Sequence, residues 1–266
     1  MMLWQRIGSA LIAAPLVLWA VYAGGWPYIV LLTAMSFIAW HELQAMLPAS
    51  DRLVRRLGYI LLIMLIYIGW RWPQGVLLAS TMSILVLLAT LLWRYERERW
   101  QTVTHAITSF CYLGFPILHL IKLGNLPSGW RWIVLLLATV WSYDSFAFFT
   151  GCSLGKRRPW PHISPNKSIE GVMGGLLGSM LIATVAFRLL FPHLELEQLL
   201  VYGLPFGLGV GIFAQAGDLF ESALKRSFAI KDSGRFLPGH GGLLDRVDSV
   251  LFATPFVYYF LEMFML

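Results

Sequence analysis

Long apolar stretches, separated by short polar segments, run along the chain and predict membrane-spanning helices. A spanning helix needs about 20 mostly apolar residues. Nine stretches are candidates, although one of them is short and the last contains acidic residues. They are residues 7–23, 26–45, 57–70, 75–93, 104–121, 130–150, 170–190, 198–217 and 248–265. We therefore predict an all-α polytopic membrane protein with about nine transmembrane helices.

The composition points to the same class of protein. Hydrophobic residues make up 58% of the 266 positions and charged residues 13%, whereas soluble domains carry about a quarter charged residues. Cys111 and Cys152 lie in or beside apolar runs, so we predict neither a disulfide framework nor a zinc site. We expect the first apolar run to be retained rather than cleaved as a signal peptide, because a short hairpin joins it to the second run.

Basic residues are unevenly distributed between alternate loops, and this asymmetry predicts the orientation in the membrane. The net charge is +6, and Lys and Arg collect on the cytoplasmic side of membrane proteins. With nine helices, sixteen of the twenty Lys and Arg residues fall on one side, and Arg71, Lys122, Arg131 and Arg188 fall on the other. We therefore predict a cytoplasmic amino terminus and an external carboxyl terminus. Orientation explains the basic charge, so we expect no nucleic-acid partner.

Two longer polar segments, 151–170 and 218–247, both fall on the predicted cytoplasmic side. These segments and the adjacent helix ends contain the side chains that are suited to chemistry. We therefore divide the chain into two parts. Residues 1–128 form a scaffold of transmembrane helices, and residues 129–266 form the helices that carry the two catalytic loops.

Five carboxylates lie at helix ends or inside an apolar stretch on this side. Asp144 lies inside the sixth stretch, Glu170 opens the seventh, Asp218 closes the eighth, and Asp245 and Asp248 open the ninth. Ionisable residues within membrane segments are costly and often functional, and Mg²⁺ prefers oxygen ligands. We therefore predict a divalent cation here. Helix capping is an alternative for Asp245 and Asp248 and is preferred for Glu170 alone, and a buried polar link between helices is an alternative for Asp144.

One helix face combines acidic, hydroxyl and basic side chains. Asp218, Glu221, Ser222 and Lys225 are spaced i, i+3, i+4 and i+7, so a helix would place them together. Such a pattern usually marks a solvated, salt-bridged surface. Because this face continues directly from a membrane stretch, we favour contact with a metal ion or a substrate.

Two further segments have the character of phosphate sites. Leu237–Gly242 contains three glycines, which let backbone N–H groups approach a phosphate, and His240, which can donate to it or act as an acid or base. Lys167 and Ser168 precede a helix amino terminus, which attracts anions. Together with the carboxylates, these segments predict phosphoryl or nucleotidyl transfer to a lipid. The glycines that follow are spaced for tight helix packing instead: Gly171, Gly174, Gly175 and Gly178.

The run from Ser222 to Asp248 resembles the signature of the phosphatidate cytidylyltransferases, also called CDP-diacylglycerol synthases, without a mismatch. Its positions include Ser222, Lys225, Arg226, Lys231, Asp232, Gly234, Pro238, His240, Gly241, Gly242, Asp245, Arg246 and Asp248. Two upstream segments also resemble the family: Asp144-Ser145 with Ala147, and Ser164-Pro165 through Lys167-Ser168, Glu170 and Gly171. The resemblance covers roughly residues 141–178 and 214–249. Phe148 stands where the family has tyrosine, so no hydroxyl role is carried over to it.

The resemblance implies a multi-pass membrane enzyme, commonly a homodimer, that uses CTP and a divalent cation such as Mg²⁺. The implied reaction is attack by the phosphate oxygen of phosphatidic acid on the α-phosphorus of CTP, which gives CDP-diacylglycerol and releases pyrophosphate. The implied location is a bacterial cytoplasmic (inner) membrane, with the active site on the cytoplasmic face.

The resemblance also implies roles for individual residues. Asp218 and Asp245 would hold the cation, and Asp248 and Asp144 would support it or bind a second ion. Phosphate-neutralising or positioning roles are implied for a larger set, which comprises Lys225, Arg226, Lys231, Ser222, Lys167, Ser168, Glu170 and Arg246. His240, Gly241 and Gly242 would cradle the triphosphate, and His240 and Lys225 would be catalytic together with Asp218 and Asp245.

Two other classes of function are weighed against this one. A transporter or channel would carry polar residues along a path through the bilayer, whereas here they gather at one face. A CTP-dependent polyprenol kinase would attack the γ-phosphorus instead and release CDP. Labelled CTP supplied with phosphatidate separates the three, since the products are pyrophosphate, CDP or neither.

Overall fold

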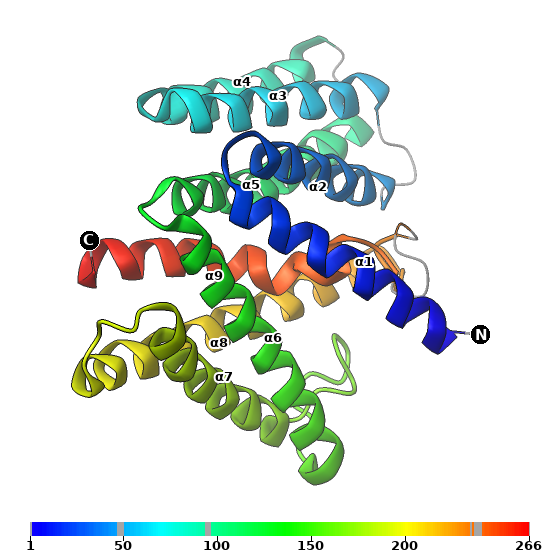
Figure 1. Ribbon diagram of the computed structural model, residues 1–266. Helices are drawn as coiled ribbons and strands as arrows, with labels where there is room; N and C mark the ends of the chain where they lie inside the picture. Colours follow the sequence, from blue (N-terminus) through cyan, green and yellow to red (C-terminus); the bar gives the residue numbers. More distant parts are fainter. Residues whose placement is uncertain (1, 47–50, 94–96, 235, 237–240, 266) are drawn as a thin grey trace. The chain divides into compact units, whose positions relative to one another are not determined.

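The computed structural model describes residues 2–46, 51–93, 97–234, 236 and 241–265. Over these ranges the chain forms α-helices and one short 3-10 turn (Pro73–Gly75), with no β-strand (Figure 1). The helices are α1 (Met2–Ala23), α2 (Gly25–Ala45), α3 (Arg52–Arg71), α4 (Val76–Trp93), α5 (Arg97–Asn125), α6 (Gly129–Leu154), α7 (Ile169–Leu190), α8 (Leu196–Ser227) and α9 (Leu244–Phe264). Each predicted apolar stretch falls on one of these helices, so the all-α prediction is confirmed.

Helix length and composition support a membrane protein. Within the described residues, seven helices, α3 to α9, are long and apolar enough to cross a bilayer. Helix α1 contributes a shorter apolar part, Ala13–Ala23. Helix α2 is not among the seven, because Trp26 and Pro27 at its start and His41 and Glu42 near its end reduce its mean hydropathy. The count of nine spans and the orientation of the termini stay predictions.

The chain divides into two compact units, and the first comprises Met1–Leu126 with Asp232–Arg246. Its helices α2, α3 and α5 are joined by hydrogen bonds from buried polar side chains to backbone carbonyls. The Tyr28 hydroxyl donates to Leu120 O (2.9 Å), and Trp40 Nε1 donates to Arg55 O (3.1 Å). A glycine at 58 permits the second contact, because a Cβ there would lie 1.8 Å from the Trp40 ring.

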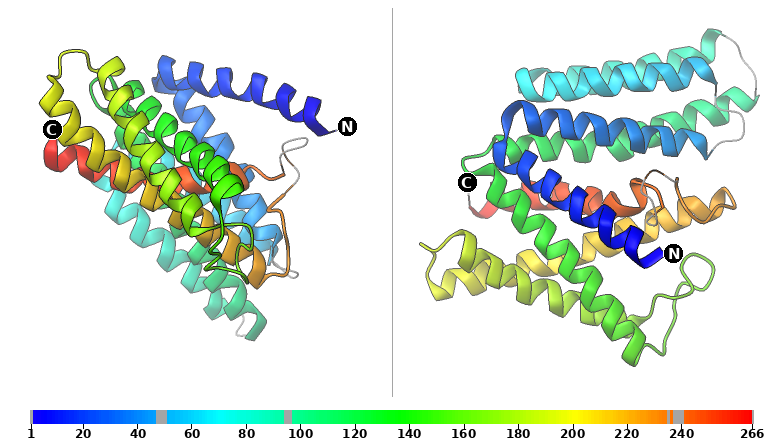
Figure 2. Two further views of the ribbon diagram at one scale, coloured as in Figure 1. Left: turned by 90° about the horizontal axis from the view of Figure 1, so that it is seen from below. Right: turned by 45° about the vertical axis from the view of Figure 1, so that its right-hand side comes forward.

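The second unit comprises Pro127–Lys231 with Val247–Leu266. Helices α6 and α7 form an antiparallel pair, visible in both views of Figure 2. Small residues bring them together, since a Cβ at Gly174 would lie 2.2 Å from Thr150 Oγ1 and a Cβ at Gly178 would lie 2.3 Å from the Phe146 side chain. The predicted packing role of these glycines is therefore confirmed. Stacked and tilted aromatic pairs, such as Phe213 with Phe256, join α8 to α9.

One predicted boundary was wrong, and the error affects the site. Helix α8 continues to Ser227, ten residues beyond the end of its apolar stretch. Residues 218–227 are therefore helical rather than part of a loop, and Asp218 lies inside the helix rather than closing it. The reason is that Leu, Ala, Glu, Lys and Arg, which dominate this decapeptide, propagate a helix regardless of hydropathy. The segment 232–246 groups with the amino-terminal helices, apart from the rest of the carboxyl-terminal half.

Candidate functional site

In the first unit, Asp245 is held by backbone and hydroxyl donors. It lies in the first turn of α9, and its Oδ2 accepts hydrogen bonds from Ser233 N (3.0 Å), Ser233 Oγ (2.9 Å) and Gly242 N (2.9 Å). Gly241 adopts a φ of 85°, a backbone conformation that favours glycine. Ser233 and Gly242 are thus tied to one carboxylate oxygen, which fixes where this side chain points.

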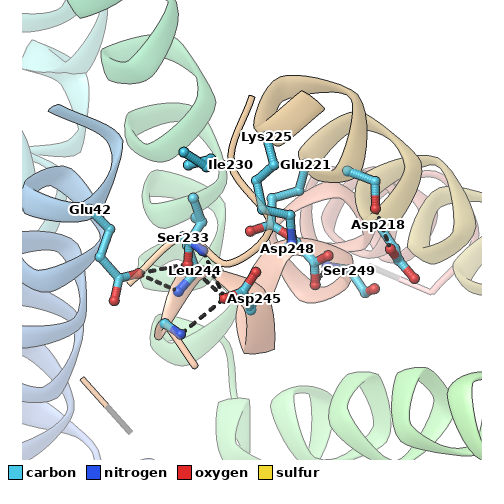
Figure 3. A network of polar contacts seen from close by, with 12 residues as sticks. Glu42, Asp218, Glu221, Lys225, Ile230, Ser233, Leu244, Asp245, Asp248 and Ser249 are labelled. Carbon is cyan, nitrogen blue, oxygen red and sulfur yellow. Dashed lines mark hydrogen bonds and ion pairs between the residues drawn. The ribbon is translucent and has the colours of Figure 1, made fainter. Parts of the chain in front are cut away.

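Glu42, on α2, is a second carboxylate that binds the segment around Asp245 (Figure 3). It was not among the residues predicted from the sequence. Its Oε1 accepts from Leu243 N (2.9 Å), and its Oε2 accepts from Leu244 N (2.9 Å) and Ser233 Oγ (3.2 Å). The side chain is buried, with 4% of the residue surface exposed. An acidic residue inside an otherwise apolar stretch is a functional signal in membrane proteins. The same signal directed attention to Asp144 and was equally present at Glu42.

In the second unit, Asp218 on α8 is paired with a cation. Lys167 Nζ lies 2.6 Å from Asp218 Oδ2, and the Ser222 hydroxyl donates to Asp218 Oδ1 over 3.3 Å. The Asp218 side chain retains 37% of its exposure, whereas that of Lys167 retains 19%. The structure therefore brings together three residues that the sequence analysis assigned to the site from two separate segments.

The remaining residues of this helix face are buried rather than solvated. Lys225 Nζ donates to Glu221 Oε2 (2.9 Å), and these side chains are 12% and 2% exposed, respectively. Asp248 on α9 is buried beside them (Figure 3), and a Cβ at Gly217 would lie 2.5 Å from the Asp248 carbonyl oxygen. The alternative of an ordinary solvated helix face is therefore wrong for Glu221 and Lys225. Burying an ion pair can cost more in desolvation than the attraction returns, so the burial of Glu221 and Lys225 favours a functional reason for this arrangement.

Ser168 and Glu170 organise the start of α7. Ser168 is the N-cap residue, and its Oγ accepts from Gly171 N (3.1 Å). Glu170 Oε2 accepts from the backbone N–H groups of Lys156 (3.0 Å) and Arg157 (3.2 Å). Glu170 lies in the first turn of α7, where the helix dipole favours a carboxylate, and the same carboxylate also binds the loop that follows α6. Both side chains hold the segment that presents Lys167.

Asp144 lies on α6, exposed, next to a buried link between helices. The neighbouring Tyr143 hydroxyl donates to Gln215 Oε1 on α8 over 2.5 Å. Gln215 precedes Asp218 by less than one turn of α8. Tyr143 thus makes a buried polar link between helices, and this link holds α6 against α8 at the level of the acidic residues.

Three other predicted binding residues, Arg226, Lys231 and Arg246, lie at the surface. Arg226 is exposed and donates to Ile163 O (3.4 Å) and Ile230 O (3.2 Å). Lys231 and Arg246 are exposed, and Gly242 is buried beside Ser233 Oγ. His240 lies outside the described residues. The assignment of these residues to substrate binding stays a prediction.

The fit of a divalent cation is judged from the donor set. Among the residues that the structure describes, no three His, Cys, Asp or Glu side chains form a group that could hold a metal ion. Mg²⁺, however, is commonly bound through one or two carboxylates together with substrate phosphates. Asp218 already attracts the Lys167 ammonium, and Asp245 is oriented by neutral donors. Carboxylate oxygens of this kind fit a hard cation, while the predicted sharing of one ion by residues of different units stays a prediction.

Comparison with known proteins now decides the family. The model of the Cytidylyltransferase family matches residues 4–264. The chain belongs to this family. It is 38% identical to the phosphatidate cytidylyltransferase of Bacillus subtilis (strain 168) over 276 residues, which cover 98% of each chain. It is 34% identical to the enzyme of the same name from Staphylococcus saprophyticus, with 94% of this chain and 95% of the other covered.

A third relative concentrates the similarity in part of the chain. The phosphatidate cytidylyltransferase of Thermotoga maritima is 48% identical over 127 residues, which cover 47% of each chain. These findings confirm the resemblance drawn from the signature around Asp218 and Asp245. They also confirm that the chain is a nucleotidyltransferase of the cytidylyltransferase family and, with the apolar helices, an integral membrane protein.

Proposed function

We propose that this cytidylyltransferase transfers a cytidylyl group from CTP to phosphatidic acid. A phosphate oxygen of the lipid attacks the α-phosphorus of CTP, the bond from that phosphorus to the oxygen bridging the α- and β-phosphates breaks, and pyrophosphate leaves. Similarity to phosphatidate cytidylyltransferases along nearly the full chain supports this reaction. The observation that carries it in the structure is the Lys167–Asp218 pair beside the buried charged face of α8.

Lysine residues supply the positive charge that the triphosphate requires. Lys167 exchanges its bond to Asp218 for a bond to a phosphate oxygen, since its ammonium pairs with a partly exposed carboxylate and the residue lies before a helix amino terminus, which attracts anions. Lys225, held by Glu221 at 2.9 Å, faces the same helix surface. Arg226, Lys231, Arg246, Ser222 and the glycines around His240 complete the binding of nucleotide and lipid phosphate. Positioning and charge neutralisation of this kind account for most of the catalysis in phosphoryl-type transfers.

Asp218 and Asp245 are the proposed ligands of a divalent cation, Mg²⁺ in the first instance, with Asp248 and Asp144 supporting it or holding a second ion. When bound, such a cation supplies neutralisation of the negative charge on the phosphates. Asp245 presents its carboxylate in an orientation set by three donors to one oxygen. Asp218 is released for this role when Lys167 turns to a phosphate.

The membrane arrangement is part of the same proposal. Nine helices cross a bacterial inner membrane, with the amino terminus and the active site on the cytoplasmic side and the carboxyl terminus outside. The distribution of Lys and Arg between alternate loops supports this orientation. The functional protein is a homodimer. Cysteine labelling from either side of inverted vesicles, at sites introduced in the loops before α2 and after α6, tests the orientation.

A product assay with purified protein in detergent micelles tests the reaction. CTP labelled at the α-phosphorus should give labelled CDP-diacylglycerol in the presence of phosphatidate and Mg²⁺, and CTP labelled at the γ-phosphorus should give labelled pyrophosphate. A lipid kinase would instead transfer the γ-label to the lipid, and a transporter would leave both labels in CTP. Removal of divalent cations by EDTA should abolish turnover, and Mg²⁺ should restore it; turnover that persists in EDTA contradicts the cation proposal.

A further inference from the structure

Glu42 forms a connection between two parts of the first unit that are distant in sequence. The hydrogen bonds from Leu243 N and Leu244 N to its carboxylate span 201 and 202 residues of sequence. Its donors are the backbone N–H groups at the start of α9, which have no partners within their own helix. A carboxylate at a helix amino terminus is also favoured by the helix dipole. Glu42 therefore caps α9 from a different helix, α2, whereas most helices are capped by a residue close to their own start in the sequence.

The capped segment is the one that carries Asp245. Ser233 joins the two carboxylates, because its Oγ lies 2.9 Å from Asp245 Oδ2 and 3.2 Å from Glu42 Oε2. Its single hydroxyl hydrogen can be donated to only one of them at a time. Gly234 and Gly242 make this approach possible, since a Cβ at these positions would lie 2.4 Å and 2.8 Å from the Glu42 carboxylate oxygens. The segment is thus built around the Glu42 side chain.

Helix α2 supplies a rigid base for this carboxylate. His105 Nε2 on α5 donates to Leu43 O at 2.9 Å, and Trp40 Nε1 donates to Arg55 O at 3.1 Å. Both bonds lie within one turn of Glu42, and they join α2 to α3 and to α5. The backbone at Glu42 is therefore held in place, and its carboxylate can leave the segment only by a change of side-chain rotamer that breaks its hydrogen bonds.

We propose that Glu42 is a positioning residue that sets the start of α9 and thereby aims the Asp245 carboxylate. This inference rests on the proposed role of Asp245 as a cation ligand. Glu42 does not touch the reacting atoms in this proposal; it acts through the backbone of Leu243 and Leu244 and through Ser233. Supporting partners of metal ligands usually contribute roughly 10-fold to 100-fold to metal affinity or activity, and we expect a contribution of that size here.

The first measurement uses the cation-free protein and does not depend on turnover. In Glu42→Gln, one acceptor oxygen becomes an NH₂ group that faces backbone donors. Hydrogen–deuterium exchange of a peptide spanning 241–246 should therefore accelerate by about tenfold or more. A peptide from α7 should exchange as in the wild type, and Glu262→Gln, which removes an exposed carboxylate near the end of α9, should leave both peptides unchanged. Unchanged exchange at 241–246 in Glu42→Gln would overturn the proposal.

The second measurement is the dependence of turnover on cation concentration. Glu42→Gln should raise the Mg²⁺ concentration for half-maximal activity by roughly 10-fold to 100-fold, with the KM for CTP at saturating Mg²⁺ within about threefold of wild type. A purely structural defect would lower the amount of active protein without moving the Mg²⁺ midpoint, and that outcome also overturns the proposal. Should Glu42→Gln fail to fold, Ser233→Ala removes a single hydroxyl from the same network and should shift the midpoint in the same direction.

Asp245→Asn distinguishes failure of this inference from failure of the proposed function. Loss of activity in Asp245→Asn with a normal Mg²⁺ midpoint in Glu42→Gln contradicts the role of Glu42 alone. Normal activity in Asp245→Asn contradicts the cation site itself, whatever Glu42→Gln does.

Discussion

Asp218 and Asp245 are proposed for the same task, yet the protein holds them in opposite ways. Asp245 accepts three hydrogen bonds on one oxygen from the backbone and hydroxyl of Ser233 and the backbone of Gly242. Asp218 is 37% exposed and is held by a lysine side chain at 2.6 Å and a hydroxyl at 3.3 Å. Asp245 is thus fixed mainly by backbone donors, and Asp218 is held by side chains that can rotate away.

This difference suggests that Asp245 keeps a fixed orientation, whereas Asp218 can exchange its partner. Backbone donors cannot leave without local unfolding, so Asp245 keeps its direction before and after substrates bind. An ammonium on a flexible four-carbon stem can exchange its partner, so Lys167 can move from Asp218 to a phosphate. We infer that Asp245 is the preorganised carboxylate and that Asp218 is the carboxylate that responds to substrate.

The largest expected effect comes from removing either carboxylate charge. Asp218→Asn and Asp245→Asn should each lower kcat by at least about 100-fold, the scale for loss of one preorganised electrostatic group. Their stabilities should differ. Asp245→Asn disturbs several donors and should cost about 1–3 kcal/mol, whereas Asp218→Asn breaks a partly exposed ion pair and should cost no more than about 1 kcal/mol.

Thermal unfolding of both variants in the same detergent measures the second part of this comparison. Equal loss of stability in the two variants would contradict the distinction between the two carboxylates. Near-normal turnover in either variant at saturating cation would remove that residue from the cation site.

The next largest effect should follow from removing the Lys167 ammonium group. Lys167→Ala should raise the KM for CTP and lower kcat/KM by roughly 10-fold to 100-fold, because a desolvated phosphate contact is lost. Lys156→Ala is the matched control, since Lys156 is exposed in the same loop and its assigned contact uses the backbone N–H alone. Equal effects of the two substitutions would indicate a general effect of positive charge near the membrane rather than an exchange at Asp218.

The smallest effect should come from the hydroxyl beside Asp218. Ser222→Ala removes a donor at 3.3 Å, a weak bond by its length, so kcat/KM should fall by about two- to tenfold. Ser227→Ala, on the same helix but bonded to Leu224 O, should stay within about twofold of wild type. A loss in Ser222→Ala as large as that in Asp218→Asn would show that the hydroxyl contacts substrate directly.

Much of the fold followed from one-dimensional features. A helix of about 20 apolar residues satisfies its own backbone in a bilayer, so apolar length alone located the nine helices of the described residues, and turn residues marked the hairpins near 24–27 and 71–75. Boundaries that depended on hydropathy were wrong where a helix leaves the apolar region, as at 218–227 in α8. Intrinsic helix propensity continues there although the apolar run has ended.

The family and most candidate residues could also be predicted, because they lie close together in sequence around Asp218 and Asp245. The Lys167–Asp218 pair could not be predicted. It depends on the side-chain geometry at the junction before α7, where Ser168 and Glu170 fix the backbone. No periodicity in the sequence indicates which carboxylate Lys167 binds.

The sequence by itself determined the class of protein, the positions of its helices and the signature that places it in its family, because each of these depends on residues near one another in the chain. Only the tertiary structure decided that Glu42 binds the start of α9 and that residues 232–246 belong with the amino-terminal helices. The reason is physical. A buried carboxylate needs donors, and the nearest N–H groups that lack helical partners are supplied by a segment some 200 residues away.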